Sequence, residues 1–434
     1  MRTYHDPLHG AITLDGRDPV EALLIHLIDT PPFQRLRRIR QLGPASFTFH
    51  GAESSRFTHS LGVMAVARRA FDRLADTYAE LRPHRAAVLV AALMHDVGHG
   101  PYSHTAEEVF GGHHEHWTQR ILSEDDSIRS CLEAFSPDLL AHLKQIYAHQ
   151  HQLPIVWQLI SSQLDCDRLD YLMRDSYYTG ACYGQLDLDR ILLALDYDAA
   201  SQQLVVHHKG QAAIEHYLVV RYLMYAQVYN HPKNLSATWM LERIFDRARA
   251  LVAAAQLEAD DIVTAWLTYP VNDLPLDQYL AGDDVVFTYH IQRWQRHPDK
   301  TLADLCRRFT HRQLLKTSDV TDYSLQEQAT LLAKIQQQAE QQGLESDCYS
   351  GLRRVHSRGY TLYQRGIKLS TQHGPIELSQ RSPLVKTLTL PDRRTWLIYP
   401  PEIQLSPSDV PAPVGGQAKI RRREAALGAN GGLT

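Results

Sequence analysis

A histidine and an aspartate, His95 and Asp96, directly follow an apolar segment that runs from Ala86 to Met94. A helix of that composition should be buried on all sides, so the pair is expected at the end of a buried helix. An unpaired carboxylate is costly there. A divalent cation would account for the pair, because such ions bind imidazole nitrogen and carboxylate oxygen together. A hydrogen-bonded histidine–aspartate pair without metal is the alternative that these two residues leave open.

Other residues could complete a metal site. The chain contains 24 histidines and 5 cysteines, and several histidines lie between His95 and His116. His59 stands at the start of a predicted helix, and Asp167 lies far downstream in the segment LDCDRLDYLMRDS. Histidines and carboxylates would supply the nitrogen and oxygen ligands of such a site. Unrelated surface histidines are the alternative that composition alone allows.

The segment that contains Asp167 also places other polar groups on one helical face. Asp167, Tyr171 and Asp175 are spaced four residues apart, and Arg168 and Arg174 flank them. Residues at this spacing share one face of a helix. An aromatic ring between two carboxylates favours a binding-site helix over a helix with a salt-bridged, solvent-exposed face.

A second helix repeats this spacing with a cation and two aromatic residues. Arg221, Tyr225 and Tyr229 lie four residues apart in the segment YLVVRYLMYAQVYNH. Aromatic stripes usually belong to a hydrophobic core, but an arginine within such a stripe is unusual. A second wall of the same site is therefore a reasonable interpretation.

Several blocks of sequence, taken in order, resemble a known family. The segments RFTHSLGV, ALMHDVGHGPYSH and DCDRLDYLMRDS, with His114-Glu115 before the last of them, are similar to the HD-domain dNTP triphosphohydrolases. This family includes bacterial dGTPase-like enzymes and the mammalian SAM- and HD-domain dNTPase. The resemblance extends from about Asp6 to about Arg243, and no SAM domain is expected before it.

The resemblance implies one divalent metal ion per subunit. The implied ligands are His59, His95, Asp96 and Asp167. The ion would be Mg, Mn, Fe, Zn or Ni, since two imidazoles and two carboxylates do not select among these. Such an ion polarises phosphorus–oxygen bonds and lowers the pKa of bound water.

The resemblance also implies three catalytic residues. His114 would act as the general acid that protonates the 5′-oxygen of the leaving nucleoside, a role that suits imidazole because its pKa is about 6.5. Glu107, one helical turn after His104, would orient a histidine. His99 would contact phosphate.

The substrate contacts follow from the same resemblance. The expected substrate-binding residues are Gln41, Leu42, Arg56, Arg168, Tyr171, Asp175, Arg221, Tyr225 and Tyr229. Arg168 and Arg221 would bind phosphates, and Tyr171 would lie near the sugar. Asp175 would accept a hydrogen bond from the 3′-hydroxyl group, and Tyr229 would exclude the 2′-hydroxyl group of a ribonucleotide. The pair at positions 41 and 42 matches contacts with the edge of the base.

A nucleotide activator is a further expectation, and dGTP or GTP would be the activator. Asp29, Gln34 and Arg37 match positions that contact guanine at the allosteric site of the mammalian enzyme. His5 replaces an asparagine at another matching position, and Arg37 could equally lie on a solvated helix face. Tyr225 stands where the family often has a histidine, which leaves the base preference open.

The remaining pattern predicts a mainly α fold. Helices are expected near residues 20–28, 58–76, 84–96, 115–123, 128–149, 155–178, 188–194 and 211–256. Strands are expected in a hairpin within 1–16 and at 204–207, 285–289, 360–363, 385–389 and 396–399. We therefore expect an HD-domain helical bundle over residues 1–256, a smaller α+β C-terminal lobe over 257–404, and a disordered tail over 405–434.

Composition argues against several classes of partner and several cellular locations. The formal net charge of the 434 residues is −4, which argues against a broad nucleic-acid-binding surface. The cysteines are odd in number and widely spaced, so a disulfide framework is not expected. No apolar segment is long enough to cross a membrane, and no signal peptide is apparent. We expect a cytoplasmic homodimer or homotetramer.

Three functions are compatible with these residues. A dNTP triphosphohydrolase would release a deoxynucleoside and inorganic triphosphate. A different HD phosphohydrolase, either a nucleotidase or a cyclic-nucleotide phosphodiesterase, is the second possibility, although a monophosphate needs fewer cationic contacts. A non-catalytic dNTP sensor is the third, and the complete ligand set together with His114 argues against it.

Overall fold

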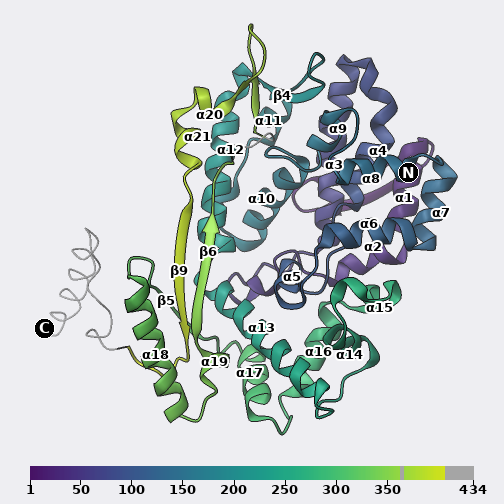
Figure 1. Cartoon of the computed structure of the whole chain (residues 1–434). Coiled ribbons are helices and arrows are strands. Elements are labelled where there is room, and N and C mark those ends of the chain that lie inside the picture. The colour runs from purple at the N-terminus through teal and green to yellow at the C-terminus, as the bar shows by residue number, and fades with distance from the viewer. Residues whose placement is uncertain (362–365, 406–434) are drawn as a thin grey trace, which may run out of the picture.

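The computed structural model describes residues 1–361 and 366–405. Two hydrophobic cores hold most of this part of the chain together. The first core surrounds α3 (Arg56–Thr77) and α4 (Arg85–Met94), and the second surrounds α13 (Pro232–Ala253). Figure 1 shows the helices of the first core on one side of the molecule and the long strands of the C-terminal part along the other. The expected mainly α architecture, with a small α+β part near the C-terminus, is confirmed.

Three helices of the first core carry the candidate metal ligands. α3 packs against both α4 and α10 (Cys166–Thr179). Every residue of α4 from Ala86 to Met94 is buried, as its composition predicted. The candidate ligands His95 and Asp96 follow directly where α4 ends.

Side-chain caps fix where the other two ligand-bearing helices begin. The Ser55 side chain accepts a hydrogen bond from the backbone N–H of Thr58 at the start of α3, and the Asp165 carboxylate accepts one from Arg168 at the start of α10. Such caps satisfy backbone donors that have no partner within the helix. Each cap lies within four residues of a candidate ligand, so His59 and Asp167 lie in the capped first turns of their helices.

The remaining helices of the N-terminal half include three that match the expected positions closely, α1 (Pro19–Ile28), α6 (His114–Glu124) and α11 (Leu188–Ala194), and several that divide longer expected helices. The others are α2 (Pro31–Arg35), α5 (His104–Phe110), α7 (Asp126–Phe135), α8 (Leu139–Tyr147), α9 (Pro154–Gln158) and α12 (Gln211–Met224). The single helix expected over 128–149 is divided near Pro137, and the one expected over 155–178 is divided between α9 and α10. The helix expected over 211–256 is interrupted by a π-helix, η6 (Tyr225–Tyr229), and restarts at Pro232. Proline accounts for two of these breaks, because it disfavours helical geometry in the preceding residue.

Two small sheets belong to the first half of the molecule. β1 (Arg2–Asp6) and β2 (Gly10–Leu14) form the expected antiparallel hairpin. A four-stranded sheet has the order β3–β4–β7–β8, with β3 (Leu195–Asp198), β4 (Gln203–His207), β7 (Lys368–Ser370) and β8 (Ile376–Glu377). β4 pairs with β7 in parallel. This pairing joins a C-terminal segment to the N-terminal half.

The C-terminal part combines helices with a three-stranded antiparallel sheet. Its helices are α14 (Asp261–Thr268), α15 (Leu276–Ala281), α16 (Asp284–Trp294), α17 (Lys300–Thr310), α18 (Leu325–Gln341), α19 (Ser346–Tyr349), α20 (Leu378–Arg381) and α21 (Pro383–Leu388). The sheet has the order β5–β9–β6, with β5 (Lys316–Asp319), β9 (Asp392–Tyr399) and β6 (Gly351–Ser357). Figure 1 shows β6 and β9 running side by side along the edge of the molecule.

Two of the expected strands are helices. The segment 285–289 lies in α16, where the Asp283 carboxylate accepts hydrogen bonds from two backbone N–H groups of the first turn. The segment 385–389 coincides with most of α21, which begins at Pro383 after a capping serine. In both cases a cap and a first-turn residue determine the structure more strongly than β-branched composition does.

The other strand predictions have different outcomes. The segments 204–207 and 396–399 lie in β4 and β9, as expected. Of the segment 360–363, Tyr360 and Thr361 are not in a strand, and the rest lies outside the described residues. The predicted disordered tail, apart from Leu405, also lies outside them, and the boundaries at 256 and 404 stay predictions. Within 1–361 and 366–405, no helix combines the length and apolar character needed to cross a membrane.

Candidate active site

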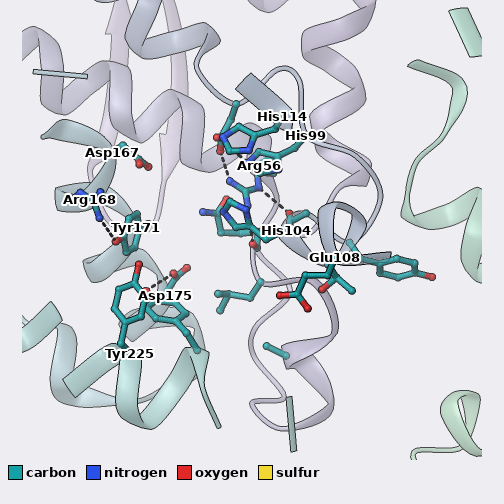
Figure 2. Close-up of a pocket in the computed structure, with 18 of the residues that line it drawn as sticks. Arg56, His99, His104, Glu108, His114, Asp167, Arg168, Tyr171, Asp175 and Tyr225 are labelled. Carbon is teal, nitrogen blue, oxygen red and sulfur yellow. Dashed lines mark hydrogen bonds and ion pairs between the residues drawn. The ribbon is translucent and has the colours of Figure 1, made fainter. Parts of the chain in front are cut away.

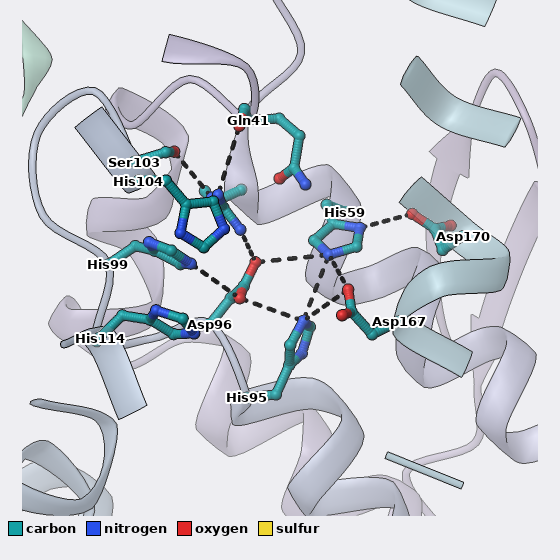
Figure 3. A network of polar contacts seen from close by, with 12 residues as sticks. Gln41, His59, His95, Asp96, His99, Ser103, His104, His114, Asp167 and Asp170 are labelled. Carbon is teal, nitrogen blue, oxygen red and sulfur yellow. Dashed lines mark hydrogen bonds and ion pairs between the residues drawn. The ribbon is translucent and has the colours of Figure 1, made fainter. Parts of the chain in front are cut away.

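Three of the four predicted metal ligands bring their donor atoms together at the centre of the first core. His59, His95 and Asp167 each offer one atom, and these atoms all lie within 4.8 Å of one another. His59 Nε2 is 3.0 Å from Asp167 Oδ1 and 3.3 Å from His95 Nε2. Figure 3 shows the three side chains converging from α3, α10 and the end of α4. Two imidazole nitrogens and a carboxylate oxygen at these separations fit the ligands of one divalent ion.

The fourth predicted ligand, Asp96, lies at the edge of this group. Its Oδ2 atom is 3.5 Å from His59 Nε2, and its Oδ1 atom is 3.3 Å from His95 Nε2. Oδ2 also accepts a 2.6 Å hydrogen bond from the guanidinium group of Arg56. Burial opposes ionisation of Asp96, but the neighbouring cations Arg56 and His95 outweigh it and hold the pKa well below its usual range. Asp96 is therefore an anion that can serve both a metal ion and Arg56.

A second layer of residues orients His59. Its Nδ1 atom is 2.8 Å from Asp170 Oδ2, and Asp170 also accepts a 2.7 Å hydrogen bond from Arg174 Nε. His9 Nε2, from the turn after β1, lies 2.5 Å from Asp170 Oδ1. A carboxylate that accepts the proton of one imidazole nitrogen leaves the other nitrogen free to bind metal. Asp170 thus directs His59 Nε2 toward His95 and Asp167.

Close packing explains how Asp170 is held in place. A Cβ atom added at Gly62 of α3 would lie 2.0 Å from Asp170 Oδ1 and 2.4 Å from Arg174 Nη2. Arg174 also donates to Asp6 Oδ2 at 2.8 Å, which ties the N-terminal hairpin to α10. The Asp170–Arg174 pair is visible in the sequence as an i, i+4 pair. No local pattern indicates the contributions of Asp6 and His9.

The electrostatic state of the cluster suits a cation. Burial lowers the pKa of His59, but its hydrogen bonds with Asp167 and Asp170 outweigh this and raise the pKa to about 10. In the absence of metal, a proton therefore supplies the positive charge that the surrounding carboxylates require. A divalent ion would replace that proton, because a ligating imidazole must be neutral on its metal-binding nitrogen.

A second group of histidines lies beside the cluster. Glu107 Oε1 is 2.5 Å from His114 Nδ1 and also accepts the backbone N–H of His114 at 2.9 Å. Glu107 Oε2 is 3.2 Å from His104 Nδ1. The rings of His114 and His99 are stacked, with centroids 3.9 Å apart. Burial, Arg56 and His114 together lower the pKa of His99 well below its ordinary value, so His99 is neutral here.

A cavity of about 670 Å³ connects these two groups with the rest of the predicted site. Eight of the nine predicted substrate-binding residues line it: Gln41, Leu42, Arg56, Arg168, Tyr171, Asp175, Tyr225 and Tyr229. Figure 2 shows Arg168, Tyr171 and Asp175 on one wall, facing His99 and His114 on the other. The cavity is large enough for a small-molecule ligand of nucleotide size.

The end of the cavity farthest along α10 contains a buried carboxylate with an unsatisfied oxygen. Asp175 Oδ2 accepts a 2.8 Å hydrogen bond from Tyr229 Oη, whereas no described residue donates to Oδ1. Burial raises the pKa of Asp175 to about 7. Tyr229 belongs to the π-helix η6, a kind of distortion that is frequent at functional sites. This end of the cavity can accept a hydrogen bond from a ligand hydroxyl group.

Two predicted phosphate-binding arginines occupy different positions. Arg168 lines the cavity and donates to Asp165 Oδ2 at 3.2 Å and to Tyr171 Oη at 3.4 Å. Arg221 is buried and does not line the cavity. Its Nη1 donates to Gln163 Oε1 at 2.9 Å, and its guanidinium carbon is 5.9 Å from the centroid of the Tyr225 ring. Arg168 is the better placed of the two to contact phosphate.

Arg56 connects the metal cluster with Gln41 and Ser103, which also line the cavity. Arg56 Nε donates to Ser103 Oγ at 2.9 Å, and its Nη2 donates to the Gln41 carbonyl oxygen at 3.4 Å. The Gln41 side chain is buried, and no described residue donates to its Oε1 atom. A buried amide oxygen without a partner is a natural acceptor for a ligand N–H group.

The predicted activator-binding residues lie away from the cavity. Asp29 pairs with Arg2, Gln34 Nε2 donates to the Ile28 carbonyl oxygen at 2.7 Å, and Arg37 Nε donates to Gln34 Oε1 at 2.8 Å. None of the three lines the cavity. Their role in binding an activator stays a prediction.

The C-terminal part contributes lining residues that the sequence did not suggest. Arg353, Arg354 and His356 of β6 line the cavity together with Glu108 of α5. Arg353 forms ion pairs with Glu108 and with Glu242 of α13. These pairs join residues more than a hundred positions apart, and nothing in the local sequence pattern indicates them.

Comparison with known proteins agrees with this geometry. Residues 56–174 match the family model of the HD domain, and residues 186–266 match that of the HD associated region. The uncharacterized protein YwfO of Bacillus subtilis is 36% identical over 414 residues, which are 92% of each chain. The chain belongs to the HD-domain family. This confirms the family resemblance that the metal-ligand segments indicated.

Two further relatives connect the family with phosphate chemistry. The crystal structure of a phosphohydrolase from Bacteroides thetaiotaomicron has a TM-score of 0.79 and 28% identity, and the match covers 92% of this chain and 99% of that one. A protein of Dictyostelium discoideum named as a homolog of the deoxynucleoside triphosphate triphosphohydrolase SAMHD1 is 30% identical over 265 residues. That match covers 56% of this chain and 50% of the relative. The chain is thus an HD-domain phosphohydrolase.

Proposed function

We propose that this protein is a metal-dependent deoxynucleoside triphosphate triphosphohydrolase. The observation that carries the proposal is a single cavity with two complementary ends. One end is lined by His95 and Asp167, whose donor atoms converge with that of the buried His59, and the other contains the unsatisfied oxygen of Asp175 beside Tyr229. A triphosphate bound at the first end would place its deoxyribose toward the second.

The residues that would hold the metal are His59, His95 and Asp167, with Asp96 as the fourth candidate. A divalent ion bound there would polarise the α-phosphate and supply an activated water molecule. We propose one ion per subunit, of the Mg, Mn, Fe, Zn or Ni class. Arg56 and Arg168 would neutralise phosphate charge, since their guanidinium groups present donors that match phosphate oxygens.

Proton transfer to the leaving nucleoside would come from His114. Glu107 holds the Nδ1 side of this ring, so Nε2 is the nitrogen left to donate to the 5′-oxygen. The neutral His99 ring stacks on His114 and restricts its rotation. General acid catalysis of this kind contributes about 10²–10⁴-fold to a rate.

Selection of the sugar would come from Asp175 and Tyr229. Asp175 Oδ1 would accept the 3′-hydroxyl group, and the Tyr229 ring would occupy the space that a 2′-hydroxyl group needs. Gln41 Oε1 would accept a hydrogen bond from the edge of the base. A dGTP or GTP activator, assembly into a homodimer or homotetramer, and a cytoplasmic location complete the proposal.

The test is product analysis with the purified protein. The four dNTPs are supplied singly and as a mixture with Mn²⁺ or Mg²⁺, and the products are separated by chromatography. Release of deoxynucleoside together with triphosphate supports the proposal, and release only from mixtures supports an activator. Cleavage of a mononucleotide or cyclic nucleotide instead would assign the protein to another class of HD phosphohydrolase. Binding of dNTP without any cleavage would make it a sensor.

A further inference from the structure

A second cluster of histidines lies at the opposite end of α4 from the catalytic cluster. His84 directly precedes the first residue of α4, whose C-terminal end leads to His95. His142 belongs to α8, and His151 lies in the loop between α8 and α9. At 1.5 Å per residue, α4 separates the two clusters by roughly 15 Å. These three residues, His84, His142 and His151, are called the three-histidine cluster below.

The nitrogen atoms of the three-histidine cluster are spaced for a metal ion. One ring nitrogen from each residue lies within 4.8 Å of the others. His151 Nε2 is 3.3 Å from His142 Nδ1. Tetrahedral zinc with metal–nitrogen bonds of about 2.0–2.1 Å holds its ligand nitrogens about 3.3 Å apart. The His142–His151 pair already has this spacing, and His84 would need only a small side-chain movement to join it.

The environment of His84 and His151 favours the neutral imidazole that binds metals. Burial and the neighbouring histidines lower the pKa of His84, and burial likewise lowers that of His151. Within the described residues, no carboxylate forms an ion pair with any of the three. A site made of imidazole nitrogens alone suits Zn²⁺, Ni²⁺ or Cu²⁺ and not Mg²⁺, which prefers oxygen ligands.

The backbone beside His151 can set the ring for metal binding. His151 Nδ1 lies 3.3 Å from the carbonyl oxygen of Leu153 and 3.1 Å from its backbone nitrogen. With the proton on Nδ1, the ring donates to the carbonyl group and its Nε2 lone pair faces His142. A ligating histidine typically donates its other N–H group to a carboxylate or backbone carbonyl in this way. With the proton on Nε2, Nδ1 instead accepts the backbone N–H of Leu153 and the ring donates to His142, so metal binding would have to select the first tautomer.

We propose that His84, His142 and His151 form a transition-metal site of the zinc class, separate from the catalytic cluster. His151 is buried, whereas His84 and His142 are half-buried, so water can reach the cluster and supply the fourth ligand. The ion links the N-terminus of α4 to α8 and to the loop after it. Tyr147 and His149 in this segment line the catalytic cavity, so the ion stabilises one wall of that cavity.

The test counts zinc in the full-length protein. Metal-free wild type, His142→Gln, His84→Gln and His95→Gln are dialysed against Zn²⁺ at a fixed free concentration, and bound zinc is measured by mass spectrometry. His216→Gln is the matched control, because His216 is an exposed histidine of α12. We expect two zinc ions per chain in the wild type and the control, one in each single variant, and none in the His95→Gln/His142→Gln double variant.

Two further measurements separate loss of metal binding from loss of folding, and neither depends on catalytic activity. Circular dichroism verifies that each variant is folded, and His84→Gln replaces His142→Gln if the latter is not. Co²⁺ loaded into His95→Gln should give the visible absorption of a four-coordinate site with three nitrogen ligands and one water ligand, and His142→Gln should remove it from that background. Zinc content in folded His142→Gln and His84→Gln equal to that of the wild type would overturn the proposal. Failure of dNTP hydrolysis would leave it intact, because no step here depends on turnover.

Discussion

Two buried carboxylates of α10, Asp170 and Asp175, differ in their hydrogen-bond partners and in the direction in which their pKa values are shifted. Near the N-terminus, both oxygens of Asp170 accept hydrogen bonds, with Arg174 and His59 among the partners, and its pKa lies well below the usual range despite burial. Five residues later, the Asp175 carboxylate has a single hydrogen-bond donor among the described residues, Tyr229, and burial raises its pKa to about 7. The first carboxylate is satisfied by the protein, and the second is not.

This difference separates a positioning role from a binding role. A carboxylate whose hydrogen bonds are complete stabilises the fold and fixes its neighbours, but it has little left to offer a ligand. A buried carboxylate without enough partners costs stability. Its cost is offset when a ligand supplies the missing donor, which is a common reason for a binding site to be less stable than the rest of a protein. We therefore expect substitutions along α10 to have effects of different kinds.

The largest effect is expected at the metal end, from Asp167→Asn. An uncharged amide is a poor replacement for a carboxylate that lies 3.0 Å from His59 Nε2, so the metal should be lost and dNTP turnover abolished. Triphosphate release and bound metal are measured together. Asp126→Asn is the control, because Asp126 is an exposed aspartate of α7. Wild-type activity in the Asp167 variant would contradict the assignment of the metal end.

A smaller loss is expected from Asp170→Asn. The variant removes the charge that fixes the proton of His59 on Nδ1, and changes of this kind typically cost about 10–100-fold in metal affinity or activity. Because Asp170 would act through His59, excess Mn²⁺ should restore much of the rate. The measurement is turnover as a function of Mn²⁺ concentration, with thermal unfolding as a check on folding. An unchanged Mn²⁺ dependence would mean that Asp170 serves only the fold.

Helix α10 also shows which features of the site the sequence could predict and which it could not. The spacing of Asp167, Tyr171 and Asp175 predicts a shared helical face, and all three line the cavity. The partner of Asp170 in the N-terminal hairpin, His9, is 161 positions away, and local periodicity carries no information about such a contact. Likewise, a pattern of 3.6 residues per turn does not predict the π-helix at residues 225–229.

The segment 285–289 illustrates a second limit. Its β-branched and aromatic residues favour a strand, yet the carboxylate of Asp283 caps a helix there. Asp284 in the first turn accepts backbone hydrogen bonds from Tyr102 and Arg40, so this helix end is also fixed by distant segments. Propensity is a weak guide where capping and tertiary contacts act together.

At the sugar end, Asp175→Asn should stabilise the protein at alkaline pH. Its folded-state pKa of about 7 exceeds the ordinary value of 3.8, so the folded state binds a proton more tightly than the unfolded state does. Wild-type stability should therefore fall as the pH rises from about 4 to about 7, by at most about 4 kcal/mol. Asparagine does not ionise, so the variant should be the more stable protein at pH 8 and nearly equal at pH 4.

Urea unfolding at pH 4 and pH 8 measures the difference in stability between Asp175→Asn and the wild type. Steady-state kinetics measures the accompanying loss of activity. Loss of a charged acceptor for the 3′-hydroxyl group should lower kcat/KM for dNTPs by about tenfold. Asp126→Asn again serves as the control and should change neither quantity. A variant less stable than the wild type at pH 8 would show that Asp175 is satisfied in solution, and the contrast with Asp170 would then fail.

The smallest effect is expected from Tyr229→Phe, which removes one hydroxyl group and keeps the ring. The Tyr229 hydrogen bond lowers the pKa of Asp175, so its loss should raise that pKa and shift the acid-side limb of the activity profile, where Asp175 ionises, to higher pH. The lost bond is worth about 1 kcal/mol, or roughly fivefold in kcat/KM. Discrimination against ribonucleotides should survive, because the ring still fills the space near the 2′ position. Tyr229→Ala should relax that discrimination, and equal selectivity in both variants would show that the ring does not select the sugar.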